Sequence, residues 1–156
     1  MAILADNGDP DFNHDGLLNC TDIDALVAEI AAGTNSTLFD LTGDGTVDIA
    51  DLDEWRVRGG AVNLASGNPY LVGDATLDGT VDALDFIAWS DNKFTSVAAW
   101  CGGDFNAEGT VDGLDFILWN DNKFTSSGGV SAVPEPGAGV LSFVALTLLA
   151  VARVRR

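Results

Sequence analysis

An internal repeat constrains the architecture of this chain more than any other feature. Residues 78–96 read DGTVDALDFIAWSDNKFTS and residues 108–126 read EGTVDGLDFILWNDNKFTS, with fifteen of nineteen positions identical. Two weaker copies lie upstream, at residues 11–22 and 40–51. Sequence similarity at recurring intervals indicates one small structural unit that is used several times. The sequence therefore predicts four copies of a twelve-residue unit, each followed by an apolar segment.

Each copy carries oxygen-bearing side chains at alternate positions. An acid stands at positions 1, 5 and 12, Asn or Thr at position 3, Asn or Asp at position 9, and glycine at position 6. Calcium takes six to eight oxygen ligands at about 2.3 to 2.6 Å, and position 7 of such a loop contributes its backbone carbonyl. Glycine makes the sharp turn because it has no Cβ to oppose a positive φ. This is the spacing of an EF-hand calcium loop, so the sequence predicts four Ca²⁺ sites.

The predicted ligands form four sets of six, one in each loop. They are Asp11, Asn13, Asp15, Leu17, Asn19 and Asp22; Asp40, Thr42, Asp44, Thr46, Asp48 and Asp51; Asp74, Thr76, Asp78, Thr80, Asp82 and Asp85; and Asp104, Asn106, Glu108, Thr110, Asp112 and Asp115. A single set would also fit a solvated acidic turn, but four sets in register favour calcium. The first set has three carboxylates and the others have four, so we expect sites of unequal affinity.

Charge and composition exclude several other functions. The formal net charge of -17 argues against nucleic acid and anionic membrane surfaces as partners, because binding them requires clustered positive charge. A hydrophobic content of 47% is too high for a disordered acidic chain. The single histidine, His14, cannot complete a histidine-rich zinc site. For Cys20 and Cys101 we expect unpaired thiols, and a disulfide in an oxidising compartment is the alternative.

Apolar residues with helical spacing follow the first two loops. From residue 23 to residue 30 they recur at i, i+3, i+4 and i+7, which predicts a helix that ends at Gly33. In the second copy, Leu52 and Trp55 lie one turn apart, and we expect the glycines at 59–60 to end that helix.

The helices predicted after the third and fourth loops are apolar nearly all round, over residues 84–89 and 114–119. Short helices of this kind must bury more than one face. Two interpretations stay open and are compatible: a core shared between two pseudo-symmetric helices, and a partly exposed apolar patch for a partner. No long helix is predicted before any loop. The expected fold class is mainly α, built from loop-then-helix units.

This unit order, with Asp instead of Glu at position 12, resembles dockerin repeats, the paired calcium-binding modules that attach bacterial polysaccharide-degrading enzymes to cohesin-bearing scaffolds. The resemblance implies F-hand repeats, similar to EF-hands, in two pairs at residues 9–60 and 74–125, with a linker at residues 61–73. It also implies a cohesin-like partner that contacts loop positions 10 and 11. These positions are Cys20, Thr21, Ile49 and Ala50 in the first pair, and Ala83, Leu84, Gly113 and Leu114 in the second.

The end of the chain has a different composition. A Ser/Gly linker at residues 126–133 precedes Pro134, Glu135 and Pro136, an apolar run at 137–152, and a basic end with Arg153, Arg155 and Arg156. Sixteen helical residues span about 24 Å, a little less than the roughly 30 Å hydrocarbon core, and the arginines favour the cytoplasmic side. A buried globular helix is the alternative to this transmembrane helix. The order resembles the PEP-CTERM sorting signal, which implies recognition by an exosortase-type processing enzyme.

The sequence shows no catalytic constellation, so we expect a non-enzymatic module of a protein that is exported to the cell envelope or extracellular space. The C-terminal helix would anchor it transiently in the membrane. Residues 1–5 are too short for a secretory signal. We therefore expect either the C-terminal portion of a longer protein or a misplaced start of the reading frame, with any catalytic domain, such as a glycoside hydrolase, upstream. The alternative function is a calcium-rigidified structural spacer of a cell-envelope or matrix protein.

Overall fold

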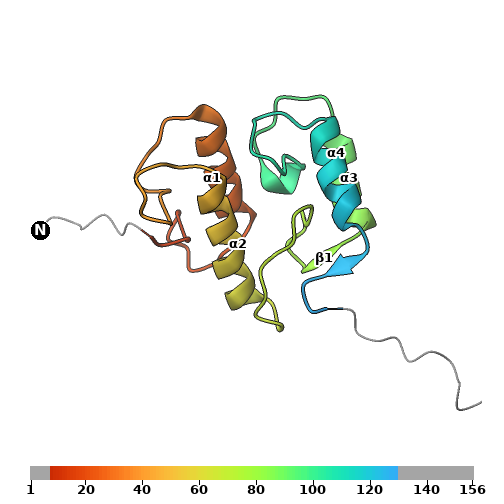
Figure 1. Cartoon of the computed structure of the whole chain (residues 1–156), viewed down its shortest axis with the longest axis horizontal. Coiled ribbons are helices and arrows are strands. Elements are labelled where there is room, and N and C mark those ends of the chain that lie inside the picture. Colours follow the sequence, from red (N-terminus) through yellow and green to blue (C-terminus); the bar gives the residue numbers. More distant parts are fainter. Residues whose placement is uncertain (1–7, 130–156) are drawn as a thin grey trace, which may run out of the picture.

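A computed structural model describes residues 8–129. In chain order the elements are α1 (Cys20–Ala32), α2 (Ile49–Asn63), β1 (Thr80–Val81), α3 (Ala83–Asn92), the 3₁₀ helix η1 (Trp100–Gly102), α4 (Gly113–Asn122) and β2 (Thr125–Ser126). Each of the four α-helices in the described region follows one of the acidic loops (Figure 1). This confirms a mainly α fold of loop-then-helix units, and adds a two-stranded sheet that the sequence did not predict.

Each helix begins directly after loop position 9 because that side chain caps it. In α1, the Asn19 side chain accepts a hydrogen bond from the Thr21 amide at 2.7 Å, and the Asp22 carboxylate accepts one from the Asn19 amide at 3.1 Å. These two bonds form a capping box, which satisfies amides that have no partner inside the helix. The same box opens α2, α3 and α4. The predicted end of α1 at Gly33 is also correct.

The predicted end of α2 was wrong. The helix continues through Gly59 and Gly60 as far as Asn63. A Cβ on Gly60 would overlap the carbonyl oxygen of Asn68 and would lie 2.9 Å from Pro69 Cα. The two glycines therefore allow the chain to return across the helix, and they do not terminate it.

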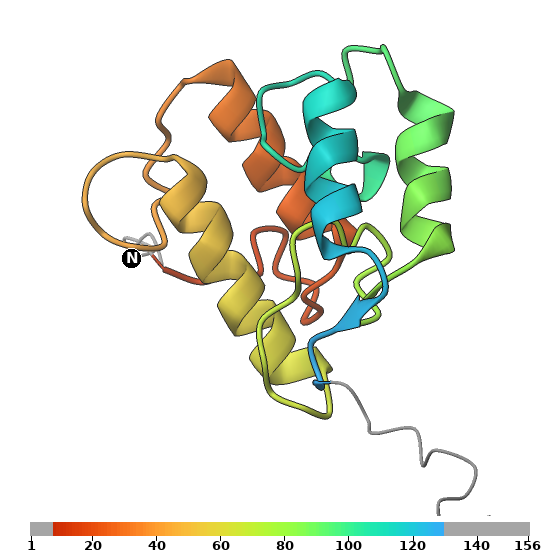
Figure 2. The same cartoon turned by 45° about the vertical axis from the view of Figure 1, so that its right-hand side comes forward.

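The helices pack as two pairs, α1 with α2 and α3 with α4 (Figures 1 and 2). Between α3 and α4, the ring centroids of Phe86 and Trp119 lie 5.1 Å apart, as do those of Trp89 and Phe116. On the other face of each helix, four apolar side chains are about half exposed: Leu84, Ile87, Leu114 and Ile117. The shared core is therefore confirmed, and the two helices also expose apolar side chains. That these side chains bind a partner stays a prediction.

The second pair is closed by a reciprocal exchange of backbone contacts. Strand β1, which ends loop three, pairs antiparallel with β2, which follows α4. Thr95, which follows α3, forms an antiparallel bridge with Val111 at the end of loop four. The segment after each helix thus returns to the loop that precedes the other helix, as expected for a pseudo-twofold pair.

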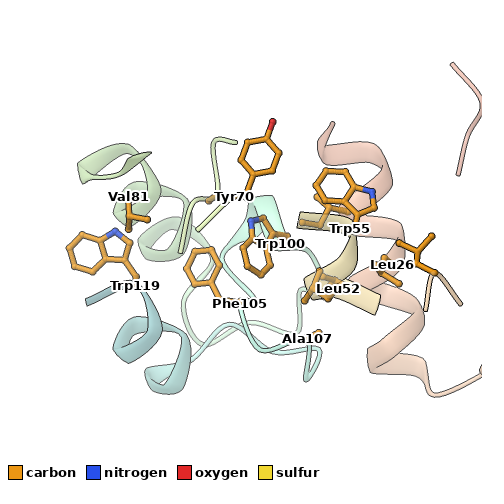
Figure 3. Close-up of a cluster of buried hydrophobic side chains, with 13 residues drawn as sticks. Leu26, Leu52, Trp55, Tyr70, Val81, Trp100, Phe105, Ala107 and Trp119 are labelled. Carbon is orange, nitrogen blue, oxygen red and sulfur yellow. The ribbon is translucent and has the colours of Figure 1, made fainter. Parts of the chain in front are cut away.

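One hydrophobic core runs through both pairs. Trp55 of α2, Trp100 of η1 and Tyr70 are each no more than 1% exposed, and Trp100 lies between Tyr70 and Phe105 (Figure 3). The segment at residues 61–73, expected as a linker, contains the end of α2 and the buried Tyr70.

Cys20 and Cys101 form a disulfide, so the expectation of unpaired thiols was wrong. Cys20 opens α1 and Cys101 lies in η1, and the packing of α1 against η1 brings their Cα atoms to 5.9 Å. The two residues are 81 positions apart in sequence, so only the tertiary contact between the pairs could reveal the bond.

Within residues 8–129, no helix is both long enough and apolar enough to cross a membrane. The predicted sorting motif at 134–136, the apolar run and the terminal arginines lie outside the described residues.

Candidate metal-binding loops

The acid at position 1 organises the turn of each loop through backbone amides. In loop three, the Asp74 carboxylate accepts hydrogen bonds from the amides of Asp78 at 3.2 Å and Gly79 at 2.9 Å. The position-1 acids of loops one and two accept hydrogen bonds from the same two amides, those of positions 5 and 6. The position-1 acid of loop four accepts a hydrogen bond from the glycine amide at 2.9 Å. Glycine suits position 6 because its φ in loop three is +86°. The loops are therefore wound around their first carboxylate.

The acid at position 12 joins the two ends of each loop. One oxygen of Asp115 accepts from the Asp112 amide at 2.8 Å, and the other accepts from the Phe105 amide at 2.8 Å. The position-12 acids of the other three loops also accept hydrogen bonds from backbone amides at both ends of their loop. This acid is also the third residue of the following helix, where it completes the capping box.

The predicted ligands divide into a buried group and an exposed group. Six aspartates at positions 1 and 12 are fully buried: Asp22, Asp51, Asp74, Asp85, Asp104 and Asp115. Most predicted ligands at positions 3 and 5 face solvent, namely Asn13, Asp15, Thr42, Asp44, Thr76, Asp78 and Glu108, whereas Asn106 is half-buried. Each loop thus has charge on its inner side and oxygen atoms at its open side.

No positively charged side chain of the described region balances the buried acids. Arg56 pairs with Asp53 and Arg58 pairs with Glu54, and neither acid belongs to a loop. His14 approaches only Asp9, which precedes the first loop. Buried charges require a partner, because burial removes the hydration that stabilises them. The donor set therefore fits a hard cation such as calcium, which takes carboxylate, amide and carbonyl oxygens.

Three of the buried acids, Asp74, Asp104 and Asp115, have raised pKa values. Burial raises the pKa of Asp74 from 3.8 to about 7. The hydrogen bond from the Gly79 amide opposes this rise, and the negative charge of Asp85 adds to it. Burial in the same way raises the pKa of Asp104 to about 6 and raises that of Asp115. Without a cation, Asp74 therefore titrates near neutral pH, and Asp104 titrates about one pH unit lower.

Loop four has the strongest geometric indication of a cation site. The carboxylates of Glu108, Asp112 and Asp115, at positions 5, 9 and 12, offer oxygen atoms that all lie within 4.8 Å of one another. The Oδ1 atom of Asp104 at position 1 is buried and has no hydrogen-bond partner in the described chain. In loops one to three no three carboxylates approach as closely. The long arm of Glu108 explains the difference, since the shorter position-5 acids turn to the amide of position 7.

Sequence reasoning missed a second set of residues that shape the loops, the four tryptophans. The indole N–H of Trp89 donates to the Asp112 carbonyl at 2.7 Å, and that of Trp119 donates to the Asp82 carbonyl at 3.0 Å. Each helix of the second pair thus holds the loop that precedes the other helix. Trp55 and Trp100 donate to the carbonyls of Pro10 and Asp74. The identical place of Trp89 and Trp119 in the two repeats was the available signal.

Of the eight residues predicted to contact a partner, the four of the second pair lie at the exposed starts of α3 and α4: Ala83, Leu84, Gly113 and Leu114. In the first pair Thr21, Ile49 and Ala50 are exposed as well, whereas Cys20 is half-buried in the disulfide. Two further apolar residues that were not predicted, Phe94 and Phe124, are 79% and 77% exposed. The backbone explains their proximity to this face, since Phe124 donates its amide to the Val81 carbonyl and Phe94 donates to that of Val111, both at 2.6 Å.

Comparison with protein-family models, with curated proteins and with solved structures found no match to this chain.

Proposed function

We propose that this chain is a calcium-binding, dockerin-like module, in which two pairs of F-hand repeats bind up to four Ca²⁺ and present a surface for a cohesin-like or other surface protein. The module would be non-enzymatic and would serve attachment, in a setting of polysaccharide degradation. The proposal rests on the loop spacing, on the loop-then-helix order, and on the pseudo-symmetry of the second pair.

One observation carries the calcium proposal: six aspartates are completely buried, and no positively charged side chain of the described residues pairs with them. Bound calcium would supply the missing positive charge. The orientation of the carboxylates at positions 1 and 12 by backbone amides supports the proposal, since these carboxylates need little rearrangement to reach an ion. Weak sites with Kd of about 10⁻⁴ to 10⁻³ M are useful at extracellular calcium concentrations.

Calorimetric titration of calcium into the full chain, with far-UV circular dichroism on the same samples, tests this proposal. We expect about four ions per chain and a gain of helix that a chelator reverses, since binding and folding are coupled in small metal-dependent domains. Asp104→Asn should lower the number of calcium ions bound per chain by about one. Asp121→Asn is the matched control, because Asp121 is exposed on α4 outside the loop. Absence of binding by the unmodified chain would overturn the proposal.

The partner surface would be the exposed apolar face at the starts of α3 and α4. Leu84 is 56% exposed and Leu114 is 54% exposed, at equivalent positions of the two repeats. Their pseudo-symmetry would let a single partner bind in either of two orientations. Exposed apolar side chains grouped on one face are typical of protein-binding surfaces.

Calcium-dependent capture from the native secretome, with elution by chelator, tests this surface. The double variant Leu84→Asp and Leu114→Asp should lose the captured partner, because a carboxylate would be desolvated in either orientation. Val62→Asp is the control, since Val62 is 72% exposed but lies on α2. If both variants retained the partner equally, the surface would be elsewhere.

For the segment after residue 129, we propose the sorting function that its resemblance implies. The protein would be exported, held transiently in the membrane by the C-terminal apolar run, and processed by an exosortase-type enzyme at 134–136. Replacing Glu135 with Ala in the native host should abolish processing. The readout is the mass of the mature C-terminus.

The disulfide favours a second function, a rigid spacer in the cell envelope or matrix. It joins the first pair to the second and would hold their relative orientation. A spacer would retain no protein in a calcium-dependent way, so the capture experiment distinguishes the two functions.

A further inference from the structure

We infer that the short turn at η1 couples the four loops to one another, and that the Cys20–Cys101 disulfide makes calcium affinity depend on redox state. The oxidised chain should bind calcium more tightly than the reduced chain, and calcium should stabilise the disulfide against reduction by dithiols. This inference rests on the proposed calcium binding and concerns its regulation.

The turn at η1 contacts both loops of the second pair. The indole of Trp100, which is fully buried, donates to the carbonyl of Asp74, the first residue of loop three, at 2.7 Å. One residue, Gly103, separates η1 from Asp104, the first residue of loop four. Gly103 has a φ of +100°, and a Cβ there would lie 2.7 Å from the Cα of Trp89. A displacement of η1 would therefore move the position-1 acids of both loops.

The same turn is tied to the start of α1, and through Cys20 to loop one, by two bonds. Cys101 is disulfide-bonded to Cys20, which is loop position 10 and the first residue of α1. The Cys101 amide also donates to the carboxylate of Asp24 in α1 at 2.9 Å. Loop four approaches the far end of α1 as well, because a Cβ on Gly109 would lie 3.1 Å from that of Ala31. These contacts join the first helix to the second pair.

Loop two reaches η1 through the helix that follows it. The guanidinium carbon of Arg56 in α2 lies 5.7 Å from the ring centroid of Trp100, within the range of a cation–π interaction. Arg56 also donates to the Tyr70 carbonyl at 3.0 Å, which fixes its position. Every loop thus contacts η1 either directly or through the helix that it caps.

Reduction would remove the one covalent constraint in this network. The balanced reaction with a dithiol converts the disulfide to two thiols and the reductant to its cyclic disulfide, with transfer of two electrons and two protons. The hydrogen bond from Cys101 to Asp24 does not depend on the disulfide, so the reduced chain should keep part of the coupling. Linkage requires that the factor by which oxidation strengthens calcium binding equals the factor by which calcium opposes reduction.

Equilibration of the full chain with mixtures of reduced and oxidised dithiothreitol tests the inference. Thiols are alkylated and counted by mass, once in saturating calcium and once in excess chelator. We expect the equilibrium constant for reduction to be at least about tenfold lower in calcium. The double variant Cys20→Ser and Cys101→Ser should bind calcium more weakly in a calorimetric titration. The loss in its overall calcium affinity, taken over all sites together, should equal the factor by which calcium lowers the equilibrium constant for reduction.

Two tryptophan variants separate the turn from the loops in general. Trp100→Phe keeps the disulfide but removes the donor to Asp74, so the ratio of the two reduction constants should fall toward one. Trp119→Phe is the matched control, because its indole also donates to a loop carbonyl but does so from α4. In this variant the ratio of the reduction constants in calcium and in chelator should equal that of the unmodified chain.

The outcomes are distinguishable. If the oxidised chain binds no calcium, the proposed function fails and this inference fails with it. If calcium binds but the reduction constants in calcium and chelator are equal, the inference alone is overturned. The reduction equilibrium of the unmodified chain decides the question even if the serine variant does not fold.

Discussion

Six buried aspartates define this protein at the residue scale, because each is held by backbone amides and none is paired with a cationic side chain of the described residues. Their spacing along the chain was readable from the sequence. Their burial was not, since loop acids are ordinarily solvated. The structure shows that the acids at positions 1 and 12 are buried or half-buried, whereas the acid at position 5 is exposed in all four loops. The sequence alone treats these positions as equivalent ligands.

The raised pKa of Asp74 predicts an inverted pH dependence for the calcium-free chain. Its carboxyl has a pKa of about 7 in the folded state and an ordinary value of 3.8. Between these values the folded state holds a proton that the unfolded state has released, so the free energy of unfolding falls as the pH rises through this range. Circular dichroism in chelator should therefore show more folded protein at about pH 5 than at about pH 8.

The calcium-loaded chain should behave in the opposite way, because protons compete with the cation for the same carboxylates. Asp74→Asn should weaken the pH dependence of the calcium-free chain. If the calcium-free chain instead gained structure between about pH 5 and about pH 8, the buried carboxyl groups would already be ionised at the lower pH, and the prediction would be wrong.

A second prediction at this scale concerns position 12. In Asp85→Asn the amide group can accept through only one atom, so either the Thr76 amide or the Asp82 amide loses its partner. We expect a loss of about 1 to 3 kcal/mol in urea denaturation, together with weaker calcium binding. Asp91→Asn on the exposed side of α3 is the control and should change stability by less than about 0.5 kcal/mol. Equal effects of the two variants would contradict the role of Asp85 in closing loop three.

At the scale of elements, the sequence predicted all four helices but placed their starts after position 12, whereas they begin at position 10, and it misplaced one helix end. Each start follows an Asn or Asp with an acid three residues later, which is a local signal that needs no tertiary contact. The end of α2 depends on residues 68–70, which cross the helix at Gly59 and Gly60. A glycine pair inside a helix and a glycine pair after one look alike in sequence. Only the chain that packs on them distinguishes the two.

Gly60→Ala tests this explanation of α2. A methyl group there would overlap the Asn68 carbonyl, so we expect a destabilisation of about 1 to 3 kcal/mol, which exceeds the gain of about 1 kcal/mol in helix propensity. Gly113→Ala is the matched control, because a Cβ at this first position of α4 meets no atom within 4 Å. It should be neutral or slightly stabilising. A stabilising effect of Gly60→Ala would show that the returning segment can move away from α2.

At the scale of the whole molecule, the repeat predicted two pairs but not how they join. The joining residues lie outside the twelve-residue units: Tyr70, Trp100 and the disulfide partner Cys101. Residues that occur once have no periodicity to mark them, and a long-range disulfide has no local signal. The sequence therefore described the parts of the fold, and the interface between the pairs came from the structure.

This shared core predicts that the oxidised, calcium-loaded chain unfolds in one cooperative transition, although its repeats form two pairs. Trp55 of the first pair and Phe105 of the second belong to the same buried cluster as Trp100, so neither pair can open without exposing the other. Differential scanning calorimetry should show one peak whose calorimetric and van't Hoff enthalpies agree. Each site at 100 times its Kd contributes about 2.7 kcal/mol, so removing calcium should lower or abolish this peak as a whole. Two resolved peaks, with only one sensitive to chelator, would instead show that the pairs fold independently and that the contacts around Trp100 contribute little to stability.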